Sequence, residues 1–466
     1  MNSIIIGQYI QFLRKKKGLS QRQLADKLSV TFQAVSKWER GENFPDASIL
    51  LELADILETT TDKILSGGDI VVKGNKKLNL AEMKESFTAF DGHSDVMTNE
   101  IVLIPLCGME KTAIRIKEYL HQISGNKSVI ICNVSLPRFA TGDAKAVLNE
   151  SVRGKDVYII VDVGNYSLTY TMRGYENHMS PDEHYQDIVR VVSAVGGKAN
   201  RVNVVSPLLY SARQDRRILR ESLDCAVALQ HLYSIGVSNI MAFDVHDDRV
   251  QNATPFMGFD KLMPIYQAIK SVCRSYSDIV FDENNTIVIS PDFGGMGRNY
   301  EYANELGVDM GVFYKRRSNA DFFDGKYTVE VHKYMGPEVA GKDILIVDDI
   351  LASGETMLDA IRQIKEMGAK RVFAIVTFGL FTKGTKAFDD AYEAGMLDAV
   401  FITNASYISE EVANAKWYKE VNILKYIAYY IFCVNSGYSV ARIVDPHQKI
   451  KNYIELHSEK RSKSVV

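Results

Sequence analysis

The sequence predicts an α/β fold made of two parallel-sheet halves, preceded by a small all-α domain. From residue 101 onward, short apolar runs alternate with helical stretches, which is typical of βαβ units and parallel sheets. These units extend over about 340 residues, which is long for one such layer, so two halves are expected. Helical periodicity throughout residues 1–65 predicts the all-α domain.

The expected strands are short apolar runs, and helical stretches separate them. A core helix is expected over residues 424–434, because its apolar run is too short to cross a bilayer, and a last helix over residues 447–457. The strands are expected at residues 101–105, 129–132, 157–161, 202–205, 240–243, 287–289, 311–313, 344–347, 372–377 and 400–402.

The N-terminal residues predict short helices joined by tight turns. Ser20 is suited to cap a helix that carries Leu24 inward. A second short helix over residues 31–39 carries Val35 and Trp38 inward and ends at Gly41. Two short helices joined in this way match a DNA-binding helix-turn-helix.

Composition points to a cytoplasmic protein without a membrane span. The net charge of −3 supplies no global basic field, so any DNA binding must be local to one module. The five cysteines are scattered without metal-ligand or redox spacing, which favours reduced thiols. Near the N-terminus the basic cluster follows the apolar residues, the reverse of a signal peptide.

Residues 343–356, DILIVDDILASGET, form the stretch that is richest in chemical information. A buried strand over 344–347 is expected to end at Asp348 and Asp349, with a small turn at Ser353-Gly354 and a helix opening at Thr356. Amide N–H groups of such a turn make a phosphate seat, and paired acids can hold ribose hydroxyls or Mg²⁺. The alternative is an acidic strand end with a helix cap.

Further motifs occur in one order along the chain. They are SVRGKDVYII at 151–160, YSARQDRR at 210–217, FDVHDDRVQ at 243–251, SPDFGGMGR at 290–298 and YKRRSNA at 314–320. Together with the loop at 343–356, they resemble the ribose-phosphate diphosphokinase (PRPP synthetase) family across roughly residues 101–440. A resemblance to ordinary phosphoribosyltransferases would account for the loop at 343–356 but not for the motifs before it.

The resemblance implies an enzyme that transfers diphosphate from ATP to ribose 5-phosphate to make PRPP, with Mg²⁺ as cofactor. Such a reaction needs positioning and cations more than covalent chemistry. The implied catalytic residues are Lys315 and Arg317, which follow the strand at 311–313 and stabilise the transferred group. The alternative for this KRR segment is a solvated basic turn.

The remaining site residues are carried over from the same family. Mg²⁺ prefers oxygen ligands, so His246 is expected to contact phosphate or a metal-bound water; a satisfied polar residue at a strand end is the alternative. The implied ATP-binding residues are Phe139, Thr141, Asp143, Arg213, Gln214, Asp215, Arg216 and His246. The implied metal residues are His246 and Asp292, and the implied ribose-phosphate residues are Asp348, Asp349, Ser353, Gly354 and Thr356.

The chain departs from the family pattern at several positions. Thr141 replaces the aspartate that reads adenine, and Asp143 is a shortened acid, which predicts a relaxed or changed base preference. In the phosphate loop Ala352 loses an acid and Glu355 adds one, which weakens binding unless Glu355 points to solvent. The connection at 165–180 is longer and more aromatic than in the family.

The N-terminal segment LSQRQLADKLSVTFQAVSKWERGENFPD resembles the Cro/repressor-type helix-turn-helix domain. The resemblance implies that residues 31–39 form the recognition helix; a helical interaction domain without DNA binding is the alternative. Acids nearly balance the basic residues here, which predicts a weak module that needs dimerisation or higher valency to bind well. The implied DNA-binding residues are Gln21, Thr31, Phe32, Gln33, Ser36, Lys37 and Arg40.

The two resemblances together predict the domain organisation. A homo-oligomer, either a dimer or a hexamer, is expected from both families. The predicted parts are a helix-turn-helix domain (1–66), a linker (67–100), an N-terminal PRPP-synthetase-like half (101–270), a C-terminal phosphoribosyltransferase-like half with the PRPP loop (271–440), and a C-terminal helix and tail (441–466).

Two functions remain open from the sequence. The first is a working ribose-phosphate diphosphokinase fused to a DNA-binding domain, with ATP, ribose 5-phosphate and double-stranded DNA as partners. The second is a transcription regulator whose synthetase-like part only senses PRPP, ribose 5-phosphate or a nucleotide. The retained Lys315 and Arg317 favour the first, and the changes at Thr141, Ala352 and Glu355 favour the second.

Overall fold

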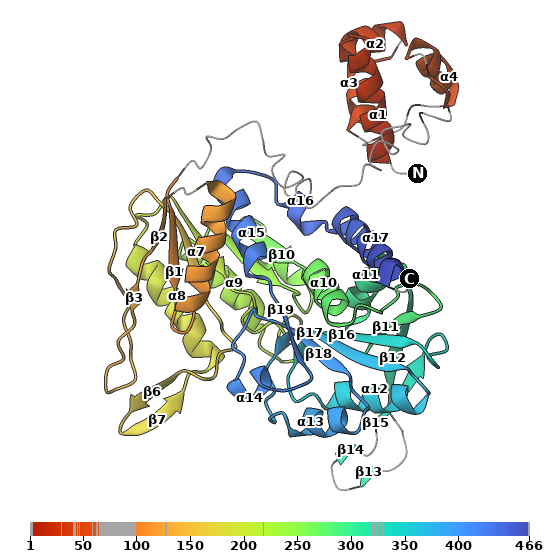
Figure 1. The fold of residues 1–466 in the computed structure, drawn as a ribbon. Coiled ribbons are helices and arrows are strands. Elements are labelled where there is room, and N and C mark those ends of the chain that lie inside the picture. The colour runs from red at the N-terminus through yellow and green to blue at the C-terminus, as the bar shows by residue number, and fades with distance from the viewer. Residues whose placement is uncertain are drawn as a thin grey trace. The chain divides into compact units, whose positions relative to one another are not determined.

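A computed structural model divides the chain into two compact units, Met1–Asp95 and Val96–Val466. The structure describes residues 3–28, 30–40, 43, 45, 47–57, 59–61, 64, 99–125, 128–217, 219–317, 322–323, 326–327 and 330–464. Almost all of the linker expected over residues 67–100 lies outside these ranges. Figure 1 shows both units.

The first unit is helical, as predicted. Ser20 accepts a hydrogen bond from the Gln23 amide (3.1 Å), and its own amide donates to the Gln23 side chain (2.8 Å), which makes a capping box. Leu24, Val35 and Trp38 are buried in its core. The helices are α1 (Ser3–Lys16), α2 (Gln21–Lys27), α3 (Phe32–Glu39) and α4 (Ala47–Ile56).

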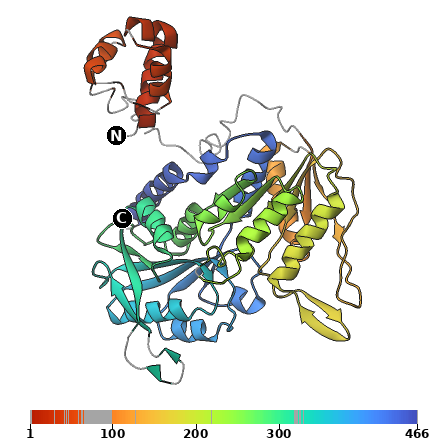
Figure 2. The same cartoon turned by 180° about the vertical axis from the view of Figure 1, so that it is seen from behind.

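The second unit begins with a six-stranded parallel sheet in the order β10-β9-β8-β5-β1-β2. Helix α7 lies on the face turned to the viewer in Figure 1, and α8 and α9 lie on the face seen in Figure 2. The strands are β1 (Ile101–Pro105), β2 (Val129–Ile131), β5 (Asp156–Ile160), β8 (Arg201–Val205), β9 (Asn239–Phe243) and β10 (Gly258–Leu262); the helices are α7 (Glu110–Ser124), α8 (Pro181–Val195), α9 (Asp224–Ser234) and the short η3 (Asp248–Ala253).

A second, seven-stranded sheet has the order β15-β12-β11-β16-β17-β18-β19 and is parallel except that β15 runs antiparallel to β12. All the strands expected from the sequence are present. The strands are β11 (Thr286–Ser290), β12 (Asp309–Arg317), β15 (Glu330–Met335), β16 (Asp343–Leu351), β17 (Arg371–Gly379), β18 (Ala399–Thr403) and β19 (Tyr418–Val421); the helices are α11 (Met296–Leu306), α12 (Glu355–Glu366), α13 (Lys386–Glu393) and α14 (Glu410–Ala413).

The chain returns to the first sheet at its end. Helix α15 (Leu424–Ser436) packs against α7, and the Tyr430 hydroxyl donates to Asp260 of β10 at 2.9 Å. Helix α10 (Ile265–Ser275), which crosses the expected border at 270/271, packs against α17 (His447–Ser464), and the short α16 (Ala441–Val444) connects α15 to α17. The helix expected at 424–434 therefore completes the N-terminal half rather than the C-terminal one.

Among the described residues, three further sheets have only two strands each, and each pair is antiparallel. In the part of the chain that is described, no helix combines the length and apolarity that membrane crossing requires. The hairpin strands are β3 (Val134–Ser135) with β4 (Val147–Leu148), β6 (Thr169–Met172) with β7 (Tyr175–His178), and β13 (Phe322–Phe323) with β14 (Lys326–Tyr327).

Candidate active site

A buried arginine joins the two sheets at the carboxyl ends of their strands. Arg298, near the start of α11, is only 7% exposed. Its Nε donates to Asp244 Oδ1 at 2.6 Å, Nη2 lies 3.2 Å from Asp349 Oδ2, and Nη1 lies 3.5 Å from Asp348 Oδ1. Asp244 follows β9 of the first sheet, whereas the other two acids belong to β16 of the second. One buried cation thus holds three carboxylates together.

Sequence reasoning missed Arg298 and Asp244 as functional residues, although both stand inside quoted motifs. Arg298 is the last residue of SPDFGGMGR, and Asp244 is the second residue of FDVHDDRVQ. Asp244 also accepts a hydrogen bond from Thr377 Oγ1 at 2.6 Å, and its φ of +42° is uncommon for a residue with a side chain. A strained residue within a motif marks a position that the surrounding contacts determine.

His246 and Asp349 form a hydrogen-bonded pair beside this arginine. His246 Nδ1 lies 2.8 Å from Asp349 Oδ2; the histidine side chain is 39% exposed and the carboxylate only 5%. The hydrogen bond to Asp349 raises the pKa of His246. Burial opposes ionisation of Asp349, but the hydrogen bond from His246 and the charge of Arg298 lower its pKa. The bonded Nδ1 leaves Nε2 as the ring atom that can meet a substrate.

Asp348 has a different environment from its neighbour. Its Oδ1 accepts a hydrogen bond from the Asp349 amide at 2.9 Å, and its side chain is 27% exposed. Burial and the charge of Asp349 raise the pKa of Asp348. The expectation that both acids follow the strand is wrong, because β16 continues to Leu351 and contains them. The sheet itself therefore sets their positions.

Asp292 lies in the turn between β11 and α11, close to the same acids. Its Oδ1 accepts from the Gly295 amide at 3.0 Å, and its charge contributes to the raised pKa of Asp348. Among the described residues no group of three or more histidine, cysteine, aspartate or glutamate side chains could hold a metal ion. The donors present fit Mg²⁺ only in its usual manner, with one or two carboxylates completed by waters and substrate phosphates.

The small turn after β16 leads through a glycine directly into helix α12. Gly354 has φ +78°, and a Cβ at this position would lie 2.5 Å from Phe388 Cε2, so only glycine fits. Helix α12 begins at the next residue, Glu355, whose carboxylate pairs with Lys383 Nζ at 2.5 Å. The added acid is thus offset by a lysine. Ser353 and Thr356 flank the glycine at the start of the helix.

The segment containing Arg213, Gln214, Asp215 and Arg216 lies beside this cluster. Arg213 Nη2 donates to the Ile350 carbonyl of β16 at 3.3 Å, and the charge of Asp215 adds to the raised pKa of His246. The charge of Arg216 helps to lower the pKa of Asp247 to about 2, after the larger effect of Arg249. These contacts bring the expected nucleotide segment and the expected ribose acids to one place.

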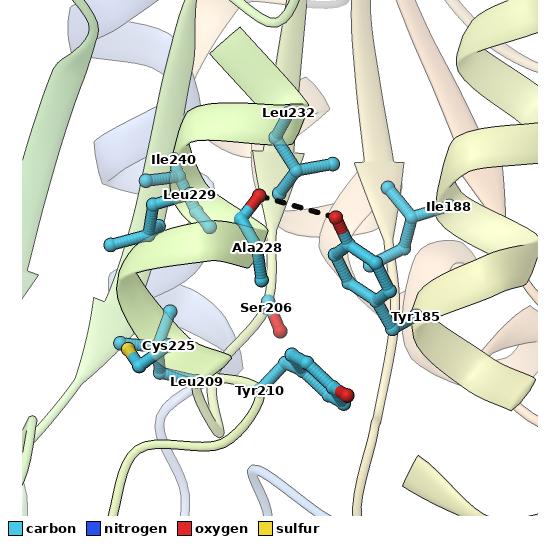
Figure 3. A pocket seen from close by; sticks show the side chains of 10 residues that line it. All are labelled: Tyr185, Ile188, Ser206, Leu209, Tyr210, Cys225, Ala228, Leu229, Leu232 and Ile240. Atoms are coloured by element: carbon cyan, nitrogen blue, oxygen red, sulfur yellow. Dashed lines mark hydrogen bonds between the residues drawn. The ribbon is translucent and has the colours of Figure 1, made fainter. Parts of the chain in front are cut away.

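A separate apolar pocket anchors the start of that segment (Figure 3). Tyr210 stacks on Tyr185 at 4.5 Å between ring centroids, and the Tyr185 hydroxyl donates to the Ala228 carbonyl at 3.2 Å. The pocket is otherwise lined mainly by aliphatic side chains of α8, α9 and β9 and by Cys225. The stacked Tyr210 precedes Arg213 by three residues in the chain.

Two sets of expected residues are not joined to this cluster by any contact described. Phe139, Thr141 and Asp143 lie on the turn between β3 and β4, which both overall views place far from β16 (Figures 1 and 2). Lys315 and Arg317 were expected to follow their strand, but β12 runs to Arg317 and contains both. Their side chains fall outside the described residues.

The helix-turn-helix residues are presented by α2 and α3. Thr31 caps α3 by accepting from the Ala34 amide at 3.2 Å. Gln21 Nε2 donates to Glu39 at 2.8 Å, so this amide is already engaged within the unit. Exposed positions on this surface are Phe32, Gln33, Lys37 and Arg40, and Ser36 is half-buried.

Family comparisons agree with this arrangement. Residues 109–236 match the N-terminal domain of ribose phosphate pyrophosphokinase, residues 259–410 match the phosphoribosyl transferase domain, and residues 10–64 match a helix-turn-helix. The chain is 30% identical over 301 residues to a ribose-phosphate pyrophosphokinase of Vibrio parahaemolyticus, covering 64% of this chain and 86% of that protein. The corresponding enzyme of Pasteurella multocida is 31% identical, with 63% and 85% covered.

A solved structure shows the same fold. Phosphoribosylpyrophosphate synthetase from Mycobacterium smegmatis superposes with a TM-score of 0.59 at 22% identity, over 72% of this chain and 99% of that one. The fold and the shared domains lead to one assignment: the chain belongs to the ribose-phosphate pyrophosphokinase family and carries a helix-turn-helix domain ahead of the family's two domains.

Proposed function

We propose that the chain is a working ribose-phosphate diphosphokinase that makes PRPP from ATP and ribose 5-phosphate. The observation that carries this proposal is the cluster in which Arg298 joins Asp244, Asp348 and Asp349 beside His246. It lies at the carboxyl ends of strands from both sheets, next to the Gly354 turn. In open α/β sheets, this edge is where ligands bind.

The reaction forms a bond between the 1-hydroxyl oxygen of ribose 5-phosphate and the β-phosphorus of ATP, breaks the bond to the α-phosphate oxygen, and releases AMP. The amides of the Ser353-Gly354 turn and the start of α12 would bind the 5-phosphate. Asp348 is the better candidate for accepting a hydrogen bond from a ribose hydroxyl, since Asp349 is already engaged by His246 and Arg298. His246 Nε2 would then face the phosphates.

Positive charge must balance the transferred diphosphoryl group in the transition state. We assign this role to Lys315 and Arg317 of β12, and nucleotide phosphate binding to Arg213 and Arg216. Mg²⁺ would neutralise phosphate charge when it is bound together with the nucleotide, with Asp292 and His246 as its nearest protein contacts.

Turnover with purified protein, ribose 5-phosphate, Mg²⁺ and ATP tests the proposal. PRPP and AMP should form in equal amounts, and Lys315→Ala should abolish both without weakening ATP binding. Absence of product from the unaltered protein, with ATP and ribose 5-phosphate both binding, would contradict catalysis.

The second candidate is a regulator that senses PRPP, ribose 5-phosphate or a nucleotide without turnover. Thr141 and Ala352, which replace acids of the family pattern, favour it. The pairing of Glu355 with Lys383 weakens the case for a sensor, because the lysine offsets part of the charge with which the added acid would oppose phosphate binding. A Lys315→Ala variant that regulates transcription like the unaltered protein would support the sensor.

We further propose that the helix-turn-helix unit binds double-stranded DNA through α3, with Gln33 and Lys37 at the base edges and Arg40 at phosphate. Fluorescence anisotropy with DNA from upstream of the chain's own coding region tests this. Loss of binding in a double Gln33→Ala, Lys37→Ala variant is expected. Equal affinity of the variant would contradict the assignment.

A homo-oligomer, dimer or hexamer, is also proposed. No contact described joins the turn at 139–143 to the Arg298 cluster within one chain, and a second copy could bring such a turn to the cluster. Light scattering after gel filtration tests it, and a monomer at micromolar concentration would contradict it. Free thiols at all five cysteines are compatible with the proposed cytoplasmic location.

A further inference from the structure

The β6–β7 hairpin packs against the turn that carries the expected base-contacting residues. Arg138 and Ala144 form an isolated antiparallel β-bridge, so that residues 139–143 between them close a tight loop. Within the loop, the Gly142 amide donates to the Phe139 carbonyl at 2.8 Å, and the Phe139 amide donates to the Asp143 carbonyl at 2.7 Å. The loop is therefore a defined turn with two faces.

One face of the loop points to solvent. Phe139 is 50% exposed, and Thr141 and Asp143 are exposed beside it, with the Thr141 hydroxyl donating to Asp143 Oδ2 at 3.0 Å. Lys145 Nζ lies 6.0 Å from the centre of the Phe139 ring. An exposed aromatic ring next to polar groups is suited to stack on a base and to read its edge.

The other face of the loop is covered by strand β6. Residues of a strand alternate between its two sides, and here Tyr170 and Met172 are half-buried while Thr171 between them is exposed. The Arg138 guanidinium lies 4.4 Å from the centre of the Tyr170 ring. A Cβ at Gly142, whose φ is +97°, would lie 2.6 Å from Met172 Sδ.

Helix α8 completes the support from a third side. Arg138 Nη1 lies 3.4 Å from Glu183 Oε1, and Nη2 lies 3.8 Å from Asp187 Oδ2. The arginine side chain is 12% exposed, so ring, carboxylates and loop enclose it. A hydrogen bond to Glu183 also raises the pKa of Tyr170, which ties the hairpin to the same carboxylate.

We propose that the β6–β7 hairpin is a specificity device in which Tyr170 and Met172 act as positioning residues for the base-reading loop 139–143. The segment is longer and more aromatic than the family pattern at 165–180, and it packs behind the loop in which Thr141 replaces the adenine-reading acid. The loop's geometry, rather than one carboxylate, then determines which base is accepted. This inference rests on the proposed synthetase function for its nucleotide.

The test compares Tyr170→Ala and Met172→Ala with Thr171→Ala, a matched control on the exposed side of the same strand. KM for ATP should rise about tenfold for Tyr170→Ala, the size expected for losing a semi-buried cation–π contact, and should also rise for Met172→Ala, which removes the side chain that packs against Gly142. Their preference for ATP over GTP should change, and KM for ribose 5-phosphate should not. Tyr170→Phe should restore most of the affinity, because it keeps the ring over Arg138.

Nucleotide binding is measured in parallel by calorimetry, so that a catalytically silent protein still gives a result. If the unaltered chain binds ATP without making PRPP, the synthetase proposal fails. The hairpin proposal is then decided by comparing the affinities of the unaltered chain and the variants for ATP and GTP. If Tyr170→Ala and Met172→Ala bind ATP and GTP as Thr171→Ala does, the hairpin proposal is overturned.

Discussion

Replacing Arg298 by methionine gives the sharpest test of the site. The substitution nearly keeps the side-chain volume but removes the cation that Asp244, Asp348 and Asp349 share. Removing one partner of a buried ion pair costs about 3–5 kcal/mol in the free energy of unfolding, because the remaining charges stay buried without compensation. With a urea m-value of about 3 kcal/mol per M, the unfolding midpoint should fall by about 1–2 M.

Trp417 offers a local reporter for this measurement. The chain has two tryptophans, Trp38 in the helical unit and Trp417, which is 1% exposed in the core of the second sheet. In a Trp38→Phe background, fluorescence reports unfolding of the sheet that contains β16 alone. Arg298→Lys is the control, since it keeps the positive charge but loses the planar guanidinium fork. Its urea unfolding midpoint should lie between those of Arg298→Met and the unaltered chain.

The pH dependence of the Arg298→Met defect follows from the carboxylates. Without the guanidinium, the buried acids have raised pKa values in the folded state, so the folded variant binds protons more readily than the unfolded chain. Its stability relative to the unaltered protein should therefore recover as the pH falls from 7 to 5. An Arg298→Met protein with an unaltered urea midpoint at pH 7 would refute the view of Arg298 as the charge that joins the two sheets.

Three further predictions follow from single contacts. The pairing of His246 with Asp349 should stabilise the fold fully below about pH 6.5, and this stabilisation should be lost as the pH rises through the raised pKa of His246. His246→Gln should therefore lower the free energy of unfolding, measured with urea, by more at pH 6 than at pH 9. An equal loss at both pH values would contradict the pair with Asp349. Gly354→Ala should cost about 1–3 kcal/mol and raise KM for ribose 5-phosphate, whereas Gly384→Ala, at φ +77° with open space around it, should leave KM unchanged. Gln33→Ala should lose about 1–3 kcal/mol of discrimination between operator and random DNA, measured by competition, while its affinity for random DNA stays the same.

Much of the site could be read from the sequence because its residues stand in contiguous motifs after apolar strands. The Gly354 turn lies at the start of a helix and His246 follows a strand, as expected, whereas the two acids lie inside β16 rather than after it. Arg298 was overlooked because its importance comes from partners far away in the chain, Asp244 and Asp349. Spacing along the sequence does not reveal that these residues meet.

The hairpins and the edge strands β10, β15 and β19 were also missed, for a physical reason. Strand prediction relied on buried apolar runs, whereas β6 and β7 carry mainly polar and exposed residues. Strand β15 pairs on only one side, with β12, so it needs no continuous apolar sequence. These elements form because a neighbouring surface or strand supports them.

By itself, the sequence determined the parallel strands, the helix-turn-helix and the order of the motifs, since local periodicity and turn chemistry encode them. Only the tertiary structure decided that α15 returns to pack on α7, that one arginine joins both sheets, and that the loop at 139–143 is supported by a hairpin. Hydrophobic periodicity tells that a face is buried, but it does not tell which partner covers it.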